Sequence, residues 1–195
     1  ILGSSSARYA YEVLDFLAKS PDERGETVTV LASSGVDEFN YGIHIAETIG
    51  GLMGPGAESV RYMGRGEAAG QYSESWFVHF ADGRSAVYTT LTGAWQPFGV
   101  IVITTKSTFQ FCMDPSRLYD ALIEQVANFL EGKPHRLAPI EDVLESVQIM
   151  LAGAASRAAG GKTVALRDLR EDGPSFDGPA FWKKYGAASG PMYAL

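Results

Sequence analysis

Three side chains that could carry out acid–base chemistry lie close together near residue 44. Asn40, His44 and Glu47 supply an amide, an imidazole and a carboxylate. On an α-helix their spacing of i, i+4 and i+7 would place them on one face. An imidazole that titrates near neutral pH is suited to exchanging a proton with a substrate hydroxyl. The sequence therefore predicts an acid–base site on this segment, with His44 at its centre.

Each of these residues also has a structural explanation. A histidine on a helix is often partly buried with its hydrogen bonds satisfied, and an asparagine is often a helix N-cap. Asn40, His44 and Glu47 could in principle bind a metal ion, but an amide with one imidazole is an uncommon ligand set. The sequence therefore predicts no metal site, and periodicity leaves His44 open between structure and function.

The helix that would carry these residues is predicted from about residue 40 to residue 53, where glycines favour its end. A β-branched, alternating stretch at 27–31 predicts the strand before it. Further strands are predicted at 59–63, 72–80, 85–91, 99–105, 108–113 and 163–166, and further helices at 8–19, 115–131 and 139–159. Because short connections join the middle strands, most must pair antiparallel. The pattern predicts an α+β fold with an open, mostly antiparallel sheet.

Composition limits the class of protein and its partners. With 195 residues, of which 46% are hydrophobic, the chain is long enough for one globular domain with a substantial core. Its formal net charge of -7 offers no basic surface for a phosphate backbone, so nucleic acid is not an expected partner. Cys112 is the only cysteine, which excludes an internal disulfide.

Hydropathy and the first residues predict where the chain works. No apolar run approaches the roughly 18 to 20 residues that cross a bilayer, and the N-terminal stretch lacks the features of a signal peptide. We therefore expect a soluble, cytoplasmic protein with no membrane contact. The first residue is Ile1 rather than Met, so we expect the chain to be part of a longer product.

Two glycine-containing stretches could suggest nucleotide binding, but their context argues against it. Residues 64–69 (GRGEAA) follow a predicted strand, yet a second strand comes next where a dinucleotide site needs a helix. We interpret this stretch as a turn between strands. Residues 161–163 (GKT) have a helix before them and a strand after them, the reverse of a phosphate loop. No cofactor-binding residues are therefore predicted in this chain.

Three stretches, taken in order, are similar to one known family. Residues 3–9 (GSSSARY) look like a passage from a nucleotide domain into a substrate domain. Residues 40–47 (NYGIHIAE) look like an Asp/Asn-x-x-x-His motif in its Gly-x-His variant. Residues 139–166 look like a late helix and a closing strand. Together they resemble the C-terminal domain of the glucose-fructose oxidoreductase and inositol dehydrogenase family (Gfo/Idh/MocA), over roughly residues 1–168.

The resemblance implies a fold and a role for each candidate residue. The fold would be like the C-terminal domain of dihydrodipicolinate reductase, with helices on one face of the open sheet. It would cover residues 1–168, and an extended tail at 169–195 would pack on the domain or on a partner. His44 would be the catalytic acid–base group, and Asn40 would position the sugar. The other substrate-binding candidates are Tyr41, Glu47, Arg8 and Trp95.

The resemblance also implies partners that lie outside this chain. Members of the family bind NAD or NADP through an N-terminal Rossmann domain that carries a catalytic lysine, and this chain has neither. A carbohydrate or polyol would be the substrate, and the free face of the sheet would form a homo-oligomer. Asn40 stands where many members have aspartate, which removes a charge that would raise the pKa of His44. A neutral imidazole able to act as a base is therefore expected.

The main prediction is the substrate-binding and oligomerisation domain of an NAD(P)-dependent sugar or polyol oxidoreductase. Two other classes of function stay open. The chain could be a stand-alone carbohydrate-binding or assembly module without catalysis, which sugar binding without nicotinamide binding would favour. It could also be a cofactor-independent lyase or isomerase that uses His44 and Glu47, which turnover of a sugar acid without nicotinamide would establish.

Overall fold

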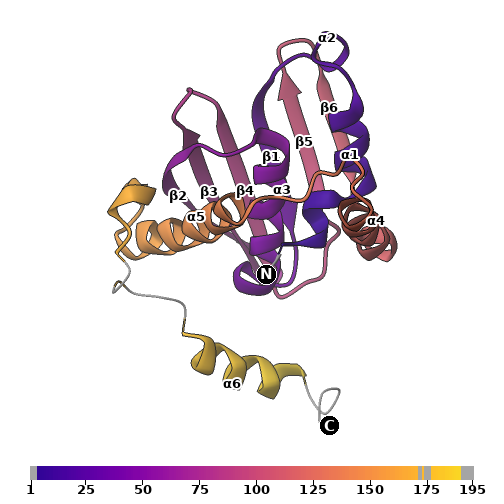
Figure 1. Ribbon diagram of the computed structural model, residues 1–195. Coiled ribbons are helices and arrows are strands. Elements are labelled where there is room, and N and C mark those ends of the chain that lie inside the picture. Colours follow the sequence, from indigo (N-terminus) through magenta and orange to yellow (C-terminus); the bar gives the residue numbers. More distant parts are fainter. Residues whose placement is uncertain (1–3, 171–172, 174–176, 190–195) are drawn as a thin grey trace.

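The computed structural model describes residues 4–170, residue 173 and residues 177–189, with side chains described up to residue 183. Within these residues a seven-stranded sheet carries helices on one face (Figure 1). The strands are β1 (Thr27–Ser34), β2 (Ala57–Ala68), β3 (Gln71–Phe80), β4 (Ser85–Thr92), β5 (Gly99–Thr104), β6 (Thr108–Cys112) and β7 (Val164–Ala165). The α-helices are α1 (Tyr11–Ala18), α2 (Pro21–Arg24), α3 (Ile43–Met53), α4 (Leu118–Leu130), α5 (Ile140–Ala158) and α6 (Gly178–Ser189). Short helical turns are η1 (Ser6–Tyr9), η2 (Glu38–Gly42), η3 (Pro115–Arg117) and η4 (Leu166–Asp168).

One pair of strands in this sheet is parallel. The strand order is β6-β5-β1-β4-β3-β2-β7, and β1 runs parallel to β4 with Ser34 opposite Thr90. The other neighbouring strands of the described sheet pair antiparallel. The carboxyl ends of β1 and β4 therefore meet at one edge, and η2 contacts both strands there. The segment that carries Asn40, Tyr41, His44 and Glu47 follows β1 directly and starts at these strand ends.

Alternation along the strands separates a covered face from an open one. On β3 the side chains of Glu74, Trp76, Val78 and Phe80 are buried, whereas those between them are only half-buried. The buried set faces α3 and α5, which cross the same side of the sheet in Figure 1. Each large apolar side chain buried in this way contributes about 1.5–3 kcal/mol. The core therefore holds α3 firmly against the sheet.

A stack of aromatic rings forms the middle of this core. Trp76 and Tyr88 lie with ring centroids 4.7 Å apart and planes 10° from parallel. The indole N–H of Trp76 donates to the backbone oxygen of Gly153 on α5 at 3.2 Å. A Cβ at Gly153 would lie 2.4 Å from the Tyr88 hydroxyl, so this close approach of helix to sheet requires glycine. The stack thereby sets the distance between α5 and the sheet.

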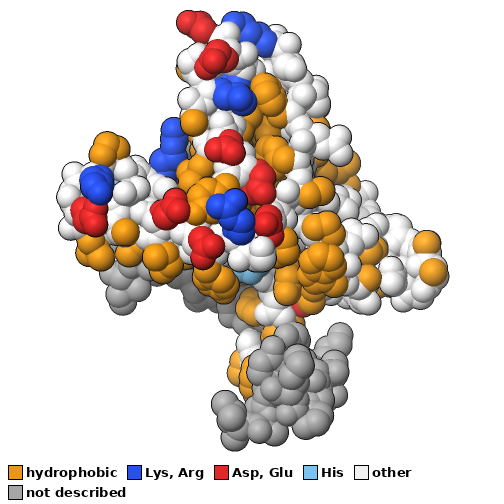
Figure 2. Space-filling view, turned by 90° about the vertical axis from the view of Figure 1, so that its right-hand side faces the viewer, with side chains coloured by type: hydrophobic (Ala, Val, Ile, Leu, Met, Phe, Trp, Pro, Cys, Tyr) orange, Lys and Arg blue, Asp and Glu red, His pale blue; other side chains and the backbone are white. Residues whose placement is uncertain are grey.

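Exposed apolar side chains lie at the surface of α4. Figure 2 faces this side of the molecule and shows hydrophobic side chains among charged ones. Tyr119, Ile123 and Leu130 of α4 are 74%, 61% and 76% exposed. Apolar side chains this exposed, when they lie together, are typical of a contact surface.

Among the described residues no helix is long and apolar enough to span a membrane.

Three local predictions differ from the structure. The predicted helix from residue 40 begins as a π-turn, and regular α-helix starts at Ile43. Residues 64–68 are the end of β2 rather than a turn, which lies at Ala69 and Gly70. The tail from residue 169 was predicted to be extended, but it contains α6, because Asp177 caps the N–H of Ala180 and starts a helix there. Part of this tail lies outside the described residues.

Candidate functional site

A strained turn leads into the site. Val36 has a φ of 72°, which is unfavourable for a β-branched residue. Its N–H donates to the backbone oxygen of Ala94 at 2.6 Å, and its own oxygen accepts from Gly93 at 3.2 Å. A Cβ on the preceding Gly35 would lie 2.3 Å from the Ala94 oxygen. The β4–β5 loop therefore forces this turn, and backbone strain of this kind is often found beside functional residues.

The π-turn η2 follows and contains Asn40 and Tyr41. Asp37 caps it, because its carboxylate accepts the backbone N–H of Asn40 at 2.6 Å. The side-chain amide of Asn40 donates to the same carboxylate at 3.1 Å. The wider π-turn changes the helical register before His44. Asn40 therefore has its amide held by Asp37, which the i, i+4 spacing could not predict.

His44 lies in the first turn of α3 between a hydroxyl and two aromatic rings. Its Nδ1 lies 2.8 Å from Oγ of Ser5. Tyr41 and Phe98 each meet the imidazole edge to face, with ring centroids 5.9 and 5.8 Å away. The side chain is half-buried, and burial lowers the pKa of His44 below its ordinary value of about 6.5. The neutral imidazole is thus favoured at neutral pH.

Glu47 and Arg8 form a buried ion pair one turn further along α3. Arg8 donates to the Glu47 carboxylate at 3.3 Å, and the side chains are 6% and 2% exposed. Ser4 donates to the same carboxylate oxygen at 2.8 Å. Arg8 also reaches Asp142 at the start of α5, at 3.5 Å. Both hydrogen-bond donors to the Glu47 carboxylate, Ser4 and Arg8, therefore come from the N-terminal segment.

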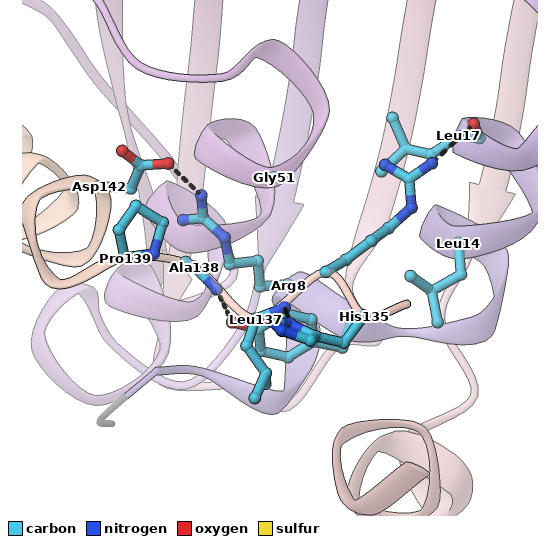
Figure 3. Close-up of a pocket in the computed structure, with 11 residues that line it drawn as sticks. Arg8, Leu14, Leu17, Gly51, His135, Leu137, Ala138, Pro139 and Asp142 are labelled. Carbon is cyan, nitrogen blue, oxygen red and sulfur yellow. Dashed lines mark hydrogen bonds and ion pairs between the residues drawn. The ribbon is translucent and has the colours of Figure 1, made fainter. Parts of the chain in front are cut away.

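A cavity of about 300 Å³ lies on the far side of Arg8. In Figure 3 the Arg8 guanidinium points toward Asp142, and the loop at 135–139 lies across the cavity from Leu14. The Tyr9 hydroxyl accepts the N–H of Ala138 at 3.0 Å and donates to Ser4 at 3.2 Å. A chain of hydrogen bonds therefore links this loop through Tyr9 and Ser4 to Glu47.

A larger, mostly apolar cavity of about 800 Å³ lies between η2, α5 and the tail. Asn40 and Ile43 line it on one side, and Met150 and Ala154 of α5 line it on the other. Arg157 lies at its wall and pairs with Glu38 and, at 3.0 Å, with Glu74. Asn40 thus lines this cavity, whereas His44 is not among the residues that line it.

The structure brings some of the predicted residues together and separates others. His44 contacts Tyr41, and Glu47 contacts Arg8, whereas the amide of Asn40 is held by Asp37. Trp95 is 62% exposed in the β4–β5 loop, whose backbone packs on Gly35. Sequence reasoning missed the polar and aromatic neighbours Ser4, Ser5, Phe98 and Asp142. The run of serines at 4–6 was the one signal that could have found two of them.

A metal ion needs a cluster of ligand side chains and a pyrophosphate needs a glycine-rich turn into a helix, and both arrangements can be compared with the described residues. No group of three or more His, Cys, Asp or Glu residues suitable for a metal occurs among them. Gly64 and Gly66 lie inside β2, and residues 161–163 join α5 to β7. Neither stretch connects a strand to the N-terminus of a helix, which is the geometry that holds a pyrophosphate. Neither glycine-containing stretch therefore has the geometry of a pyrophosphate site.

Solved structures share this fold at low sequence identity. Myo-inositol dehydrogenase from Lactobacillus casei, in complex with NAD(H) and myo-inositol, matches with a TM-score of 0.63 at 13% identity over 87% of this chain. Scyllo-inositol dehydrogenase from the same organism, with NAD(H) and scyllo-inositol, gives 0.59 at 14% over 84%. An oxidoreductase from Thermotoga maritima gives 0.58 at 17% over 85%. This chain spans 62% of the length of each of these three proteins.

No family model and no curated relative matches the sequence. The likeness therefore rests on the arrangement of strands and helices. The structural neighbours are oxidoreductases of the Gfo/Idh/MocA type, and this chain shares the fold of part of their length.

Proposed function

We propose that this chain is the substrate-binding and oligomerisation domain of an NAD(P)-dependent sugar or polyol oxidoreductase, in which His44 is the acid–base group. The observation that carries this proposal is the setting of His44. Its imidazole is half-buried at the start of α3, one ring nitrogen is held by Ser5, and burial favours the neutral form. Such an imidazole can accept the proton of a substrate hydroxyl at its other nitrogen.

The other candidate residues take supporting roles in this proposal. Tyr41, beside His44, would contact the polyol hydroxyls. Asn40 lines the larger cavity and donates to Asp37, so it would contact the polyol only where the polyol extends from that cavity to His44. Glu47 is only 2% exposed and pairs with Arg8, so in this proposal the pair holds α3 and the N-terminal segment in place. Trp95 offers an exposed ring on which a sugar could stack.

The nicotinamide is proposed to bind to a part of the protein outside this chain. Inositol dehydrogenases with the same fold have been solved with NAD(H), and this chain spans 62% of their length. The N-terminal segment at residues 4–9 lies beside His44, because Ser5 contacts His44 and Ser4 donates to Glu47 on the same helix. A preceding nucleotide-binding domain would thus connect to the molecule beside the proposed site.

The open face of the sheet is proposed to form a homo-oligomer. Half-buried side chains on this face include the apolar residues Leu31, Phe77, Val87 and Ile101. A sheet face that carries a row of apolar residues is stabilised when a second copy covers it. Analytical ultracentrifugation should show a dimer or a higher oligomer, and Phe77→Glu should dissociate it. A wild-type monomer at micromolar concentration would contradict this part of the proposal.

The catalytic part is tested by turnover of the full-length protein. Myo-inositol, scyllo-inositol and a panel of aldoses would be supplied with NAD⁺ or NADP⁺, and nicotinamide reduction would be followed. We expect turnover of at least one polyol or sugar, with a loss of about 100-fold or more in His44→Ala. Polyol binding without any nicotinamide binding would instead favour a stand-alone binding module, and sugar-acid turnover without nicotinamide would favour a lyase or isomerase.

A further inference from the structure

The Ser5 hydroxyl is held in place by the backbone of η1. Its Oγ accepts the N–H of Ala7 at 3.1 Å, and Ser5 is the N-cap of that turn. The same Oγ lies 2.8 Å from Nδ1 of His44, although 39 positions separate the two residues in the sequence. A serine hydroxyl has two acceptor lone pairs, of which the Ala7 N–H uses one. Oγ is therefore free to accept a second hydrogen bond, from the imidazole.

The segment that carries Ser5 is anchored to α3 at a second point. Ser4 donates to Glu47 at 2.8 Å, and Tyr9 donates to Ser4 at 3.2 Å. Arg8 closes the same network through its ion pair with Glu47. His44 and Glu47 are three positions apart and therefore lie on one face of α3. The adjacent residues Ser5 and Ser4 contact these two side chains, one each. A movement of Ser5 away from His44 would therefore disturb the hydrogen bonds of the adjacent Ser4.

The imidazole ring is thereby oriented. Nδ1 is turned toward Ser5, and the edge-to-face contacts with Tyr41 and Phe98 restrict rotation of the ring. The charged groups on the neighbouring elements are engaged with other partners. Glu47 on α3 pairs with Arg8 on η1, Glu38 on η2 pairs with Arg157, and Asp37, the cap of η2, accepts from Asn40. The remaining ring nitrogen, Nε2, is the one left to meet a substrate.

We propose that Ser5 is a positioning residue for the acid–base group: its Oγ accepts Nδ1–H of His44, so that the substrate proton is exchanged at Nε2. This inference rests on the proposed function of His44. When a polyol hydroxyl is oxidised with a nicotinamide as the hydride acceptor, its O–H bond breaks and the proton bonds to Nε2. The proton on Nδ1 stays there and remains hydrogen-bonded to Oγ of Ser5 throughout. The bond strengthens as the ring becomes charged, because charge-assisted hydrogen bonds are stronger than neutral ones.

The hydrogen bond is tested in the chain itself, without reference to turnover. Nitrogen-15 NMR of the imidazole resolves which ring nitrogen carries the proton and follows its titration. In the wild type the neutral His44 should carry its proton on Nδ1. In Ser5→Ala the neutral form should shift toward the Nε2–H tautomer, and the pKa of His44 should fall further, because the cation loses an acceptor. Ser5→Thr keeps the hydroxyl and should retain the wild-type spectrum.

Ser6→Ala is the matched control, because Ser6 is the next residue of the same turn, and it should leave the His44 signals unchanged. Thermal melting checks that each variant folds. A wild-type neutral His44 protonated on Nε2 would overturn the proposal, as would a Ser5→Ala variant with unchanged tautomer and titration.

Kinetics of the full-length protein then separate this inference from the proposed function. Ser5→Ala should lower kcat about tenfold and leave KM within about twofold, since general acid–base catalysis contributes roughly 10²–10⁴-fold in total. Ser5→Thr should restore most of kcat. Unchanged kcat in Ser5→Ala would overturn the positioning role even in an active enzyme. A protein with the expected tautomer that turns over no polyol or sugar would overturn the proposed function and leave the Ser5–His44 hydrogen bond standing.

Discussion

The guanidinium of Arg8 lies 3.3 Å from the carboxylate of Glu47, with the two side chains only 6% and 2% exposed. Arg8 packs over Gly51, where a Cβ would lie 3.0 Å from its Cγ and 3.2 Å from its backbone oxygen. The small residue on α3 lets the N-terminal segment approach this closely. The ion pair therefore joins that segment to the helix that carries His44.

Removal of the Glu47 carboxylate should be strongly destabilising. Glu47→Ala leaves the buried charge of Arg8 with only the more distant Asp142, and we expect a loss of about 3–5 kcal/mol in the free energy of unfolding in urea. Glu47→Gln should cost less, because the amide oxygen still accepts from Ser4. Glu67→Ala is the control, because Glu67 is 64% exposed beside Arg65 and should change stability by less than about 1 kcal/mol. Equal effects of the two alanine variants would contradict this account.

The close packing of α5 on β4 leaves no room for a side chain at Gly153, because the Tyr88 hydroxyl lies there. Gly153→Ala would place a Cβ 2.4 Å from the Tyr88 hydroxyl, and we expect a loss of about 1–3 kcal/mol from this overpacking. The Tyr88 hydroxyl is buried without a hydrogen-bond partner among the described residues, so Tyr88→Phe should be neutral or stabilising by about 1 kcal/mol. In a double-variant cycle Tyr88→Phe should relieve part of the Gly153→Ala loss. Strict additivity would show that the two sites do not clash.

The strained turn before the site should tolerate no added carbon. Gly35→Ala would bring a Cβ within 2.3 Å of two backbone atoms of the β4–β5 loop, those of Ala94 and Gln96. We expect a loss of about 2 kcal/mol or more, because backbone atoms cannot move aside as a side chain can. Gly66→Ala on β2 is a suitable comparison, since the contact there is 3.3 Å to the flexible side chain of Ser73. Chemical denaturation would separate the two, and a Gly35→Ala variant as stable as Gly66→Ala would contradict the geometry of this turn.

The stability of the chain should depend on pH through His44. Burial lowers the pKa of His44 in the folded protein, so the unfolded chain binds more protons as the pH falls below about 6.5. The unfolding free energy is therefore unaffected by the titration of His44 above that pH. It decreases as the pH falls from about 6.5 toward the pKa of His44 in the folded protein. Between about pH 7.5 and about pH 5 the wild type should therefore lose more unfolding free energy than His44→Gln. Identical losses measured by urea denaturation would show that His44 titrates normally.

The elements of the fold were largely predictable from the sequence, but one strand pairing was not. Alternation in Tyr72 to Phe80 and in Ser85 to Leu91 predicted β3 and β4, and the structure confirms both strands. The parallel pairing of β1 with β4 was missed, because the chain makes α3, β2 and β3 before it returns beside β1. Local patterns carry no information on which distant strand becomes a neighbour.

The site was predicted in part, for a similar reason. The amide, imidazole and carboxylate were found by helical spacing, but the π-turn at residues 38–42 changed the register before His44. The partners of His44 and Glu47 are serines 39 and 43 positions earlier in the sequence, which no spacing rule on one helix can reveal. The outcome for Asn40 also depended on Asp37, whose carboxylate engages its amide.

The most direct test of the central claim is the pH dependence of kcat/KM for polyol or sugar oxidation, measured for the full-length protein and for His44→Gln. If His44 is the base, the wild-type profile should rise through a single ionisation below about pH 6.5, the direction that burial gives its pKa. In His44→Gln that ionisation should disappear and kcat/KM should fall about 100-fold or more. A His44→Gln enzyme with the wild-type profile and rate would show that His44 does not exchange the proton.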